Sequence, residues 1–364
     1  MVNEIKGMNF YSFLNNDALE RRWGIEELLN QLYSIEDRFY SKKPFITKAH
    51  QIKLLKKRNL KFEQEDVAEV VLHNIPYYKL VNGFKNNILK DSKEDYSGYS
   101  FEDLIDLYNF DRELSTVIFK YILIFEESFI SSLSHYICIH LSYKDQVYLD
   151  RSKYNRGKLL PSGATEKDIV FQNIERLKKE RIKPIEHYKN YYDNVPPWIL
   201  FQSMDFGNKK YLYKICSEKI KDDIVSHYLG GYKQHQKDIF MYSLNMMNNY
   251  RNGAAHGDII SNTFYIKQPK ISKESYVRGL ASKRYVFKNY NEDIGKVGLF
   301  SLMLCMNRVF RKRTTVKDDF RNDISKTIND FETNNPKLYG EFCKSMTFPR
   351  DYLTYFDDLN NNVN

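Results

Sequence analysis

Apolar residues recur at helical spacing between residues 238 and 256, and this pattern constrains the fold more than any other in the chain. Counted from position 240, they fall at i, i+4, i+7 and i+14 on one face of an α-helix: Phe240, Leu244, Met247 and Ala254. A polar stripe runs beside them at the same spacing: Asn245, Asn249, Asn252 and His256. Gly257 follows directly and can cap the carboxyl end of a helix. We therefore predict one long amphipathic helix that ends at His256.

Arg251 stands at i+11 of the apolar stripe, where another apolar residue would be expected. A guanidinium near a protein core is costly to bury alone, so we expect Arg251 to have a partner. Asn252 and His256, one helical turn apart, complete an R-N-x-x-x-H hexad with it. A chain of this composition would contain such a hexad by chance roughly 0.03 times. The hexad either carries chemistry or is structural, with Arg251 capping a carbonyl or pairing with a carboxylate.

Few residues in the chain break helices, because it contains only 15 Gly and 9 Pro among 364 residues. This scarcity disfavours an all-β fold, whose turns would need more of both. Hydrophobic residues make up 42% of the chain, with 29 Tyr and 24 Phe, which is enough for a large core. The length allows two or three ordinary domains or one large helical body. We predict a mostly α-helical fold.

Positive charge is concentrated in three segments of a chain whose formal net charge is +9. The first segment, residues 38–62, contains nine Lys or Arg and no acidic residue, and the others span residues 267–288 and 308–313. Such surfaces suit a polyanion such as RNA, although basic residues on helices often serve only as a solvated face. The RNA-binding residues that we predict lie in the first segment: Lys53, Lys56, Lys57 and Arg58.

The four cysteines are far apart in the sequence and form no C-x-x-C pair. We therefore expect no disulfide framework, no metal site and no cofactor, and a reducing compartment fits. Residues 1–16 lack the apolar core of a signal peptide. The most apolar run, residues 117–125, is interrupted by Lys120 and is too short to cross a bilayer. We expect a soluble, cytoplasmic protein that does not contact a membrane.

The form R-N-x-x-A-H at the end of a helix resembles the signature of the HEPN superfamily, whose members include metal-independent ribonucleases of prokaryotic defence and toxin systems. Further blocks resemble Abi-like abortive-infection proteins of the AbiD/AbiF type, and they occur in that family's order. They are residues 43–47 (KPFIT), 50–55 (HQIKLL), 74–80 (NIPYYKL), 107–114 (LYNFDREL), and 196–200 (PPWIL) running into 206–207 (FG). The resemblance covers roughly residues 43 to 262.

This resemblance implies a toxin-like endoribonuclease of antiphage abortive infection that needs no metal. It places the catalytic residues in the hexad, at Arg251, Asn252 and His256. It also implies a homodimer, because HEPN ribonucleases are built from two copies that face each other. Some AbiF-like proteins are associated with a structured non-coding RNA, so a cognate RNA is a candidate partner beside the RNA substrate.

Cleavage of RNA without metal needs a base for the 2′-hydroxyl, an acid for the leaving 5′-oxygen, and a cation for the phosphate. His256 suits the proton transfers, and Arg251 suits the phosphate because its planar guanidinium binds two oxygens. Asn252, one turn before His256, can orient the imidazole or donate to a phosphate. Arg251 and His256 are five positions apart, which corresponds to roughly 140° of rotation and about 7.5 Å of rise, so the two side chains are expected to diverge. Two copies across a two-fold axis would remove that difficulty and supply a second imidazole.

A second hypothesis explains the same sequence without catalysis. The chain could be an RNA-binding or regulatory protein, associated with a small non-coding RNA, whose hexad only holds the helix end. The basic segments fit both hypotheses. Loss of His256 separates them, because a binding protein survives that loss and an enzyme does not.

We predict three parts along the chain. Residues 1–95 form an N-terminal helical extension, with a helix-turn-helix-like unit that could bind RNA. Residues 96–345 form a HEPN-type helical bundle. Residues 346–364 form an acidic, Asn-rich tail that we expect to be disordered.

Three local expectations concern the bundle. Residues 142–195 are polar and basic, and we expect an irregular insertion with one helix at 168–181. The alternating pattern of residues 262–288 suggests a short hairpin. Abi-like proteins often carry an Arg about a turn after the position of Glu126, whereas this chain has serines at residues 131 and 132. This departure concerns a supporting contact and leaves the hexad intact.

Overall fold

The computed structural model describes residues 45–85, 95–262, 266–280 and 294–361. Within these ranges every regular element is a helix, and the only β contacts are two isolated bridges. The mostly α-helical fold predicted from the sequence is therefore confirmed. The chain divides into two compact units, residues 1–109 and 110–364, which are described separately. The predicted domain limits at residues 95 and 345 stay predictions.

Two short helices lie in the first unit, α2 (Lys48–Lys57) and α3 (Glu65–Asn74), followed by the π-helical turn η4 (Tyr78–Asn82). Thr47 caps α2, because its hydroxyl accepts a hydrogen bond from the His50 backbone amide at 3.4 Å. The apolar faces of the two helices are buried: Ile52, Leu55, Ala68, Val71 and Leu72. Amphipathic packing accounts for both helices, so whether they also bind RNA stays a prediction.

The 40-residue helix α5 (Phe101–His140) starts at a capping box. The Ser100 amide donates to Asp103 Oδ2 at 2.7 Å, and the Asp103 amide donates to Ser100 Oγ at 3.2 Å. This exchange satisfies two amides that a helix start otherwise leaves open. From Phe110 onward α5 belongs to the second unit, where it is the core helix. Its apolar face is fully buried there: Leu114, Ile118, Ile122, Phe125, Phe129, Leu133 and Ile137.

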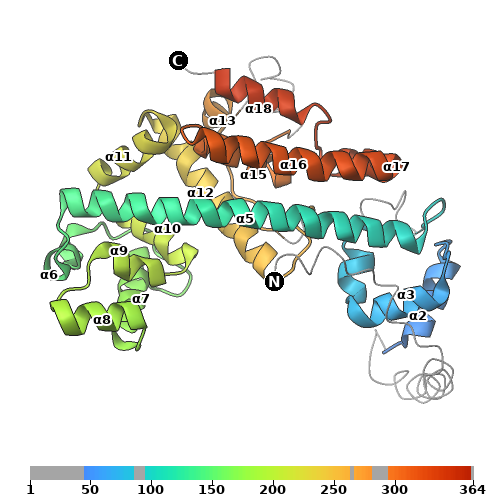
Figure 1. The fold of residues 1–364 in the computed structure, drawn as a ribbon, viewed down its shortest axis with the longest axis horizontal. Helices are drawn as coiled ribbons and strands as arrows, with labels where there is room; N and C mark the ends of the chain where they lie inside the picture. The colour runs from blue at the N-terminus through green and yellow to red at the C-terminus, as the bar shows by residue number, and fades with distance from the viewer. Residues whose placement is uncertain (1–44, 86–94, 263–265, 281–293, 362–364) are drawn as a thin grey trace. The chain divides into compact units, whose positions relative to one another are not determined.

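The other helices of the second unit surround α5. In chain order they are α6 (Asp145–Tyr148), η5 (Arg151–Lys153), α7 (Glu166–Lys179), α8 (Lys183–Tyr192), α9 (Pro197–Leu200), η6 (Phe201–Ser203), α10 (Phe206–Ile215), α11 (Glu218–Leu229), α12 (Gln234–Ala255), α13 (Lys273–Gly279), α15 (Gly298–Val309), α16 (Thr314–Asn334), α17 (Pro336–Ser345) and α18 (Tyr352–Asn361). Helices α16 and α17 run along one side of α5, and α7 to α10 lie on the other, as Figure 1 shows.

Aromatic rings fix the helices that later form the candidate site. Phe129 of α5 packs edge-on against Phe206 of α10, with ring centroids 6.3 Å apart. The same ring lies 6.1 Å from Phe240 of α12. Such buried ring contacts add about 0.5–1.5 kcal/mol each beyond the area that they bury. The amino-terminal half of α12 and the start of α10 are therefore held against the middle of α5.

Helix α5 is the one helix in the described ranges with the length and composition to cross a membrane. The complete helix is more apolar than the short run at residues 117–125, on which the sequence prediction rested. However, 44% of its most apolar 18-residue window is buried inside the protein. A helix that packs one face against α10, α12 and α16 has the pattern of a core helix, and we interpret it as one.

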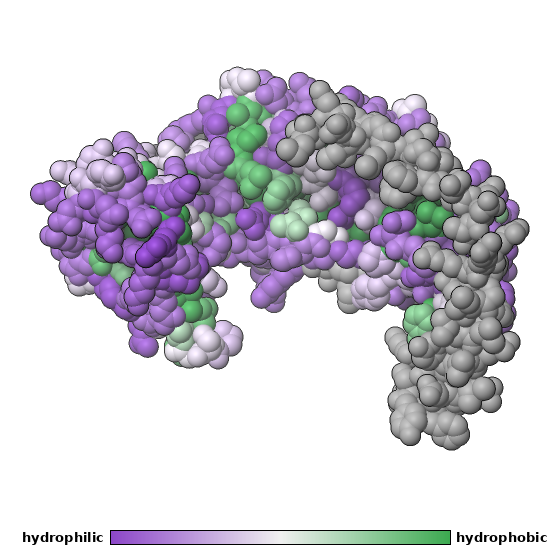
Figure 2. All heavy atoms as spheres, turned by 60° about the horizontal axis from the view of Figure 1, so that its bottom comes forward, coloured by the Kyte–Doolittle hydropathy of each residue, from purple (hydrophilic) through white to green (hydrophobic). Residues whose placement is uncertain are grey.

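The region at residues 142–195 contains more helix than predicted. Helix α7 starts at the capping box of Thr165 and Asp168, close to the predicted start. A second helix, α8, follows, whereas only one helix was predicted in this region. Pro184 stands in its first turn, where a missing amide costs nothing, and Ile185 anchors it in the core. Hydrophilic side chains dominate the surface of this region, as Figure 2 shows.

Two other expectations are wrong. The hairpin predicted in residues 262–288 is replaced by helix α13, which Ser272 caps by accepting from the Ser275 amide; residues 263–265 and 281–288 lie outside the described residues. The tail predicted to be disordered contains α18, whose apolar residues at i, i+3, i+4 and i+7 are buried: Tyr352, Tyr355, Phe356 and Leu359. Composition alone hid this face, because Asp357 and Asp358 stand between its apolar residues in the sequence.

Candidate active site

The predicted helix end at the hexad is confirmed. Helix α12 spans Gln234–Ala255, and His256 is its C-cap residue. Gly257 adopts a left-handed conformation with φ of 65°, which most other residues avoid. The amide of Asp258 then donates to the Gly253 carbonyl at 2.8 Å, which closes the last turn. The helix stops at His256 because of this reversal.

The hexad presents its polar side chains in different directions. Met247, one turn before Arg251, is fully buried. The Arg251 side chain is 32% exposed, at the edge of the core. Asn252 and His256 are exposed at the end of the helix. Arg251 therefore borders the core, whereas Asn252 and His256 face solvent.

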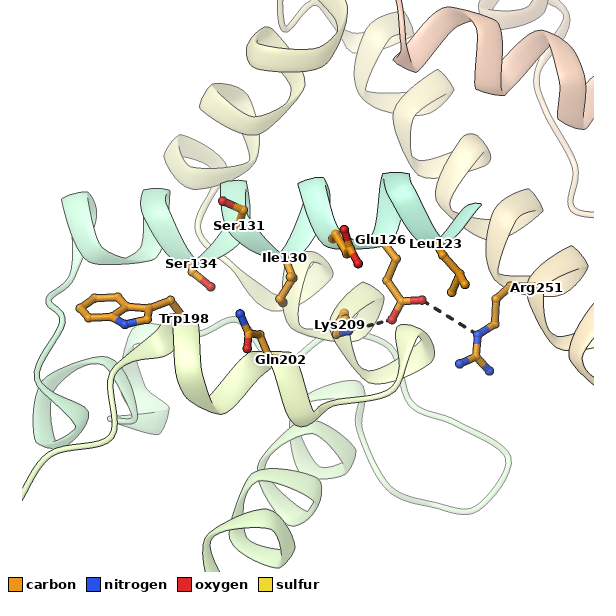
Figure 3. Close-up of a pocket in the computed structure, with 10 residues that line it drawn as sticks. Leu123, Glu126, Ile130, Ser131, Ser134, Trp198, Gln202, Lys209 and Arg251 are labelled. Atoms are coloured by element: carbon orange, nitrogen blue, oxygen red, sulfur yellow. Dashed lines mark hydrogen bonds and ion pairs between the residues drawn. The ribbon is translucent and has the colours of Figure 1, made fainter. Parts of the chain in front are cut away.

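Arg251 has the partner that its position on the apolar stripe requires. Its Nε lies 4.0 Å from Oε2 of Glu126, a buried carboxylate in the middle of α5. Glu126 Oε1 accepts a hydrogen bond of 2.7 Å from the Nζ of Lys209 on α10, which is 5% exposed. Figure 3 shows the carboxylate between the two cations. Three helices thus meet at one buried charge cluster.

The two cations are not equivalent partners of Glu126. The contact with Lys209 has the length of a charge-assisted hydrogen bond, whereas 4.0 Å to Arg251 is too long for one. Among the described residues, neither Glu126 Oε2 nor Arg251 Nε has a hydrogen-bond partner. Lys209 therefore neutralises the carboxylate structurally, and Glu126 attracts the Arg251 side chain without saturating its donors. The guanidinium can still bind an incoming anion.

The cluster lies at one end of a cleft with a volume of about 600 Å³. One wall is a face of α5, and the opposite wall comes from α9, η6 and α10. Trp198 lies toward the other end of the cleft in Figure 3. His256 and Asn252 are not among the residues that line it. In the part of the chain that the structure describes, no group of three or more His, Cys, Asp or Glu is arranged to hold a metal ion.

A second buried carboxylate holds the segment that follows the hexad. Asp111 on α5 is completely buried and accepts hydrogen bonds from the Ser261 amide at 2.7 Å and the Ile260 amide at 3.3 Å. Its neighbour Arg112 donates to the Asp258 carbonyl. Burial raises the pKa of the Asp111 carboxyl, while the Arg112 guanidinium and the Ser261 hydrogen bonds oppose that rise. Residues 107–114, noted for their resemblance to Abi-like proteins, thus anchor the chain just beyond His256.

Glycine at the third hexad position allows close packing, because a larger residue would force the Ile266 side chain to shift. A Cβ on Gly253 would lie 2.2 Å from Cδ1 of Ile266, closer than real atoms approach. Ile266 belongs to the segment that returns past the helix end, and Asn249 holds the same segment by donating to the Lys267 carbonyl at 2.7 Å. The end of α12 is therefore fixed on several sides, which suits a catalytic residue at position 256.

The serines that replace an expected arginine on α5 have other partners. Ser132 lies 3.3 Å from the Tyr228 hydroxyl, and Ser128 lies 2.9 Å from the same oxygen. Ser131 lines the cleft. The Glu126 cluster forms with Lys209 and Arg251 and does not depend on an arginine at this point.

The four predicted RNA-binding residues lie in the first unit. Lys53, Lys56 and Lys57 are exposed on α2, and Arg58, directly after the helix, is half-buried. Lys56 forms an ion pair with Glu65 and stands 5.8 Å from the Phe62 ring centroid. The folded chain therefore brings an acid to a segment whose sequence has none, and Lys56 is the weakest candidate of the four.

The sequence model of the Abi-like protein family matches residues 70–262, just over half of the chain. The chain belongs to the Abi-like family. No curated protein and no solved structure shows a significant match. The matched region includes α5, the cleft and the complete hexad. This membership connects the protein with abortive infection.

The buried pair gives a stability prediction. Glu126→Gln leaves Lys209 charged and unpaired in the core, which should cost about 3–5 kcal/mol of unfolding free energy, as broken buried pairs do. Lys209→Met should cost a similar amount, and the double variant should recover a large part of the loss. Urea unfolding of the three variants measures these free energies.

The exposed pair between Arg176 and Glu180, on α7, provides the control. Glu180→Gln should change the unfolding free energy by less than about 0.5 kcal/mol, since solvent screens that pair. If the losses at Glu126 and Lys209 simply add in the double variant, the two side chains are not coupled and the cluster has no structural role.

Proposed function

We propose that the protein is a metal-independent endoribonuclease of antiphage abortive infection, of the AbiD/AbiF type within the HEPN superfamily. Membership of the Abi-like family supports the biological setting. The main observation in support of the proposed chemistry is the arrangement of residues at the end of α12. There, a buried carboxylate attracts Arg251 at the edge of a cleft while His256 stands exposed one and a half turns later.

Each hexad residue has a role in this proposal. An imidazole takes the proton of the 2′-hydroxyl, whose oxygen attacks the adjacent phosphorus, and an imidazolium gives a proton to the departing 5′-oxygen. Arg251 binds the phosphate oxygens as negative charge develops on them. Asn252 orients the imidazole of His256. The products are a 2′,3′-cyclic phosphate and a 5′-hydroxyl.

The same geometry argues for a homodimer. In one chain Arg251 lines the cleft, whereas His256 is exposed at the helix end and does not line it, and one chain supplies only one hexad imidazole. A two-fold axis near His256 would bring the Arg251 of one copy toward the imidazole of the other and supply a second imidazole. We propose that this dimer works in the cytoplasm, that the basic segment around α2 captures RNA, and that a cognate non-coding RNA restrains or guides it.

The first test concerns catalysis. His256→Ala should reduce cleavage of single-stranded RNA by about 10²- to 10⁴-fold, the usual contribution of a general acid or base. Arg251→Ala should have a similar effect, and Arg251→Lys should recover only part of the activity because it lacks the planar fork. Initial rates on a labelled RNA measure the effect, and thermal unfolding verifies the fold.

His235, in the first turn of the same helix, is the matched control. His235→Ala should retain the activity of the unchanged protein. Equal cleavage by the His256 and His235 variants would remove the catalytic role. A protein that binds RNA tightly and cleaves it in no variant would support the alternative, a non-catalytic RNA-binding protein.

The second test concerns the dimer. Light scattering should show a homodimer, and specific activity should fall when dilution produces monomers. Adding an excess of the inactive His256→Ala protein should lower the activity of the unchanged protein, because each heterodimer retains only one of the two imidazoles. A monomer with full specific activity would contradict the proposal, as would heterodimers that form without losing activity.

The third test concerns RNA capture by the predicted residues. Replacing Lys53, Lys56, Lys57 and Arg58 by Gln should weaken binding of all single-stranded RNAs and flatten the dependence of log K on log[salt]. Each true phosphate contact contributes about 0.7 to that slope. Lys56 should contribute least, because Glu65 competes for it. Fluorescence anisotropy at several salt concentrations measures the slope.

Four exposed lysines of the second unit give a control with the same loss of charge: Lys153, Lys158, Lys179 and Lys183. Their replacement by Gln should leave the slope nearly unchanged. If both quadruple variants flatten the slope equally, binding responds to total charge, and the segment around α2 has no special role.

A further inference from the structure

Trp198 is an exposed aromatic side chain in a rigid position. It follows Pro196, the N-cap residue of α9, and Pro197 in the first turn, so the backbone before it has little freedom. The Trp198 side chain is 43% exposed although it belongs to the largest apolar type. It lines the cleft, toward the end away from Arg251 (Figure 3). A rigid, partly exposed ring beside a cleft is a stacking platform for a flat ligand.

The wall beside Trp198 is polar and uncharged. Ser134 is 2% exposed and lines the cleft, and its hydroxyl has no hydrogen-bond partner among the described residues. A buried hydroxyl without a partner costs free energy, which a ligand that bonds to it would recover. Gln202 lies opposite and is exposed, with an amide that can both donate and accept. A flat ring with donors and acceptors on its edge, such as a nucleobase, fits this combination.

The other end of the cleft holds the charges. Within the described ranges, Glu126 at 4.0 Å is the only ionic partner of Arg251. One face of α5 connects the two ends of the cleft. Along the axis of this helix, Glu126 and Ser134 are eight residues, or roughly 12 Å, apart. This span is longer than the reach from a base to its own phosphate. A base at Trp198 therefore belongs to a nucleotide near the phosphate at Arg251, and not to the nucleotide that is cut.

We propose that the Trp198 end of the cleft binds one unpaired RNA base that flanks the cleavage position. Trp198 stacks on the face of the base, and Ser134 and Gln202 bond to its edge. This inference rests on the proposed function only in assigning Arg251 to the phosphate that is cleaved. It makes the enzyme specific for single-stranded RNA, because a base inside a duplex cannot enter the cleft.

Tryptophan fluorescence tests the stacking directly. The chain contains two tryptophans, so Trp23→Phe leaves Trp198 as the sole emitter. Titration with a short 2′-fluoro RNA, which lacks the attacking hydroxyl, should quench this fluorescence to a plateau. The same strand with every base removed should bind more weakly and leave the fluorescence unquenched. Quenching by the abasic strand, or none by the intact RNA, would overturn the proposal.

Variants separate a binding role from a structural one. Trp198→Leu should weaken binding of the RNA by about 5- to 150-fold, the effect of losing one base–aromatic stack, and Trp198→Phe should recover most of it. Ser134→Ala removes a hydroxyl without a partner, so the fold should be at least as stable while RNA binds about 2- to 10-fold more weakly. Unchanged RNA affinity in both Trp198→Leu and Ser134→Ala would refute the base site.

The base site and the proposed function can fail separately. Quenching and variant effects in a protein that never cleaves RNA would leave the base site in place and remove the nuclease. Cleavage that depends on Arg251 and His256, without any change in Trp198 fluorescence, would remove the base site and leave the nuclease.

Discussion

The candidate site depends on one buried carboxylate. Glu126 lies in the core helix of the second unit, where an isolated charge would cost several kcal/mol. Lys209 neutralises it through a hydrogen bond of 2.7 Å, and Arg251 approaches its other oxygen. Because these three residues come from α5, α10 and α12, the position of the hexad is tied to the packing of the whole bundle. Arg251 is left close enough to be oriented and far enough to bind another anion.

Different parts of α5 contact different parts of the candidate site. Its amino-terminal half holds the chain beyond the hexad through Asp111, which accepts two backbone amides. Its middle orients Arg251, and the next turns line the cleft up to Trp198. His256 stands outside this arrangement on the end of α12. Arg251 lines the cleft and His256 does not, and this separation is the reason that the proposed enzyme has two copies.

Local patterns predicted local structure well. The end of α12 at His256 and the need of Arg251 for a partner both follow from periodicity and elementary energetics. The identity of that partner could not be predicted, because Glu126 lies far from Arg251 in sequence and nothing local marks it. Short apolar patterns were less reliable. The alternating pattern in residues 262–288 predicted a hairpin, whereas Lys273–Gly279 form helix α13. The prediction of a disordered tail relied on composition. The spacing of the apolar residues in this segment is that of helix α18.

The chemistry of the cleaved ends tests the central claim most directly. RNA digested by the purified protein in excess EDTA should carry 2′,3′-cyclic phosphate and 5′-hydroxyl ends, because the proposed nucleophile is the substrate's own 2′-hydroxyl and the proton carriers are imidazoles. Mass spectrometry of the fragments distinguishes these ends from others. Fragments with 3′-hydroxyl and 5′-phosphate ends, or cleavage that stops when metal is removed, would contradict the account.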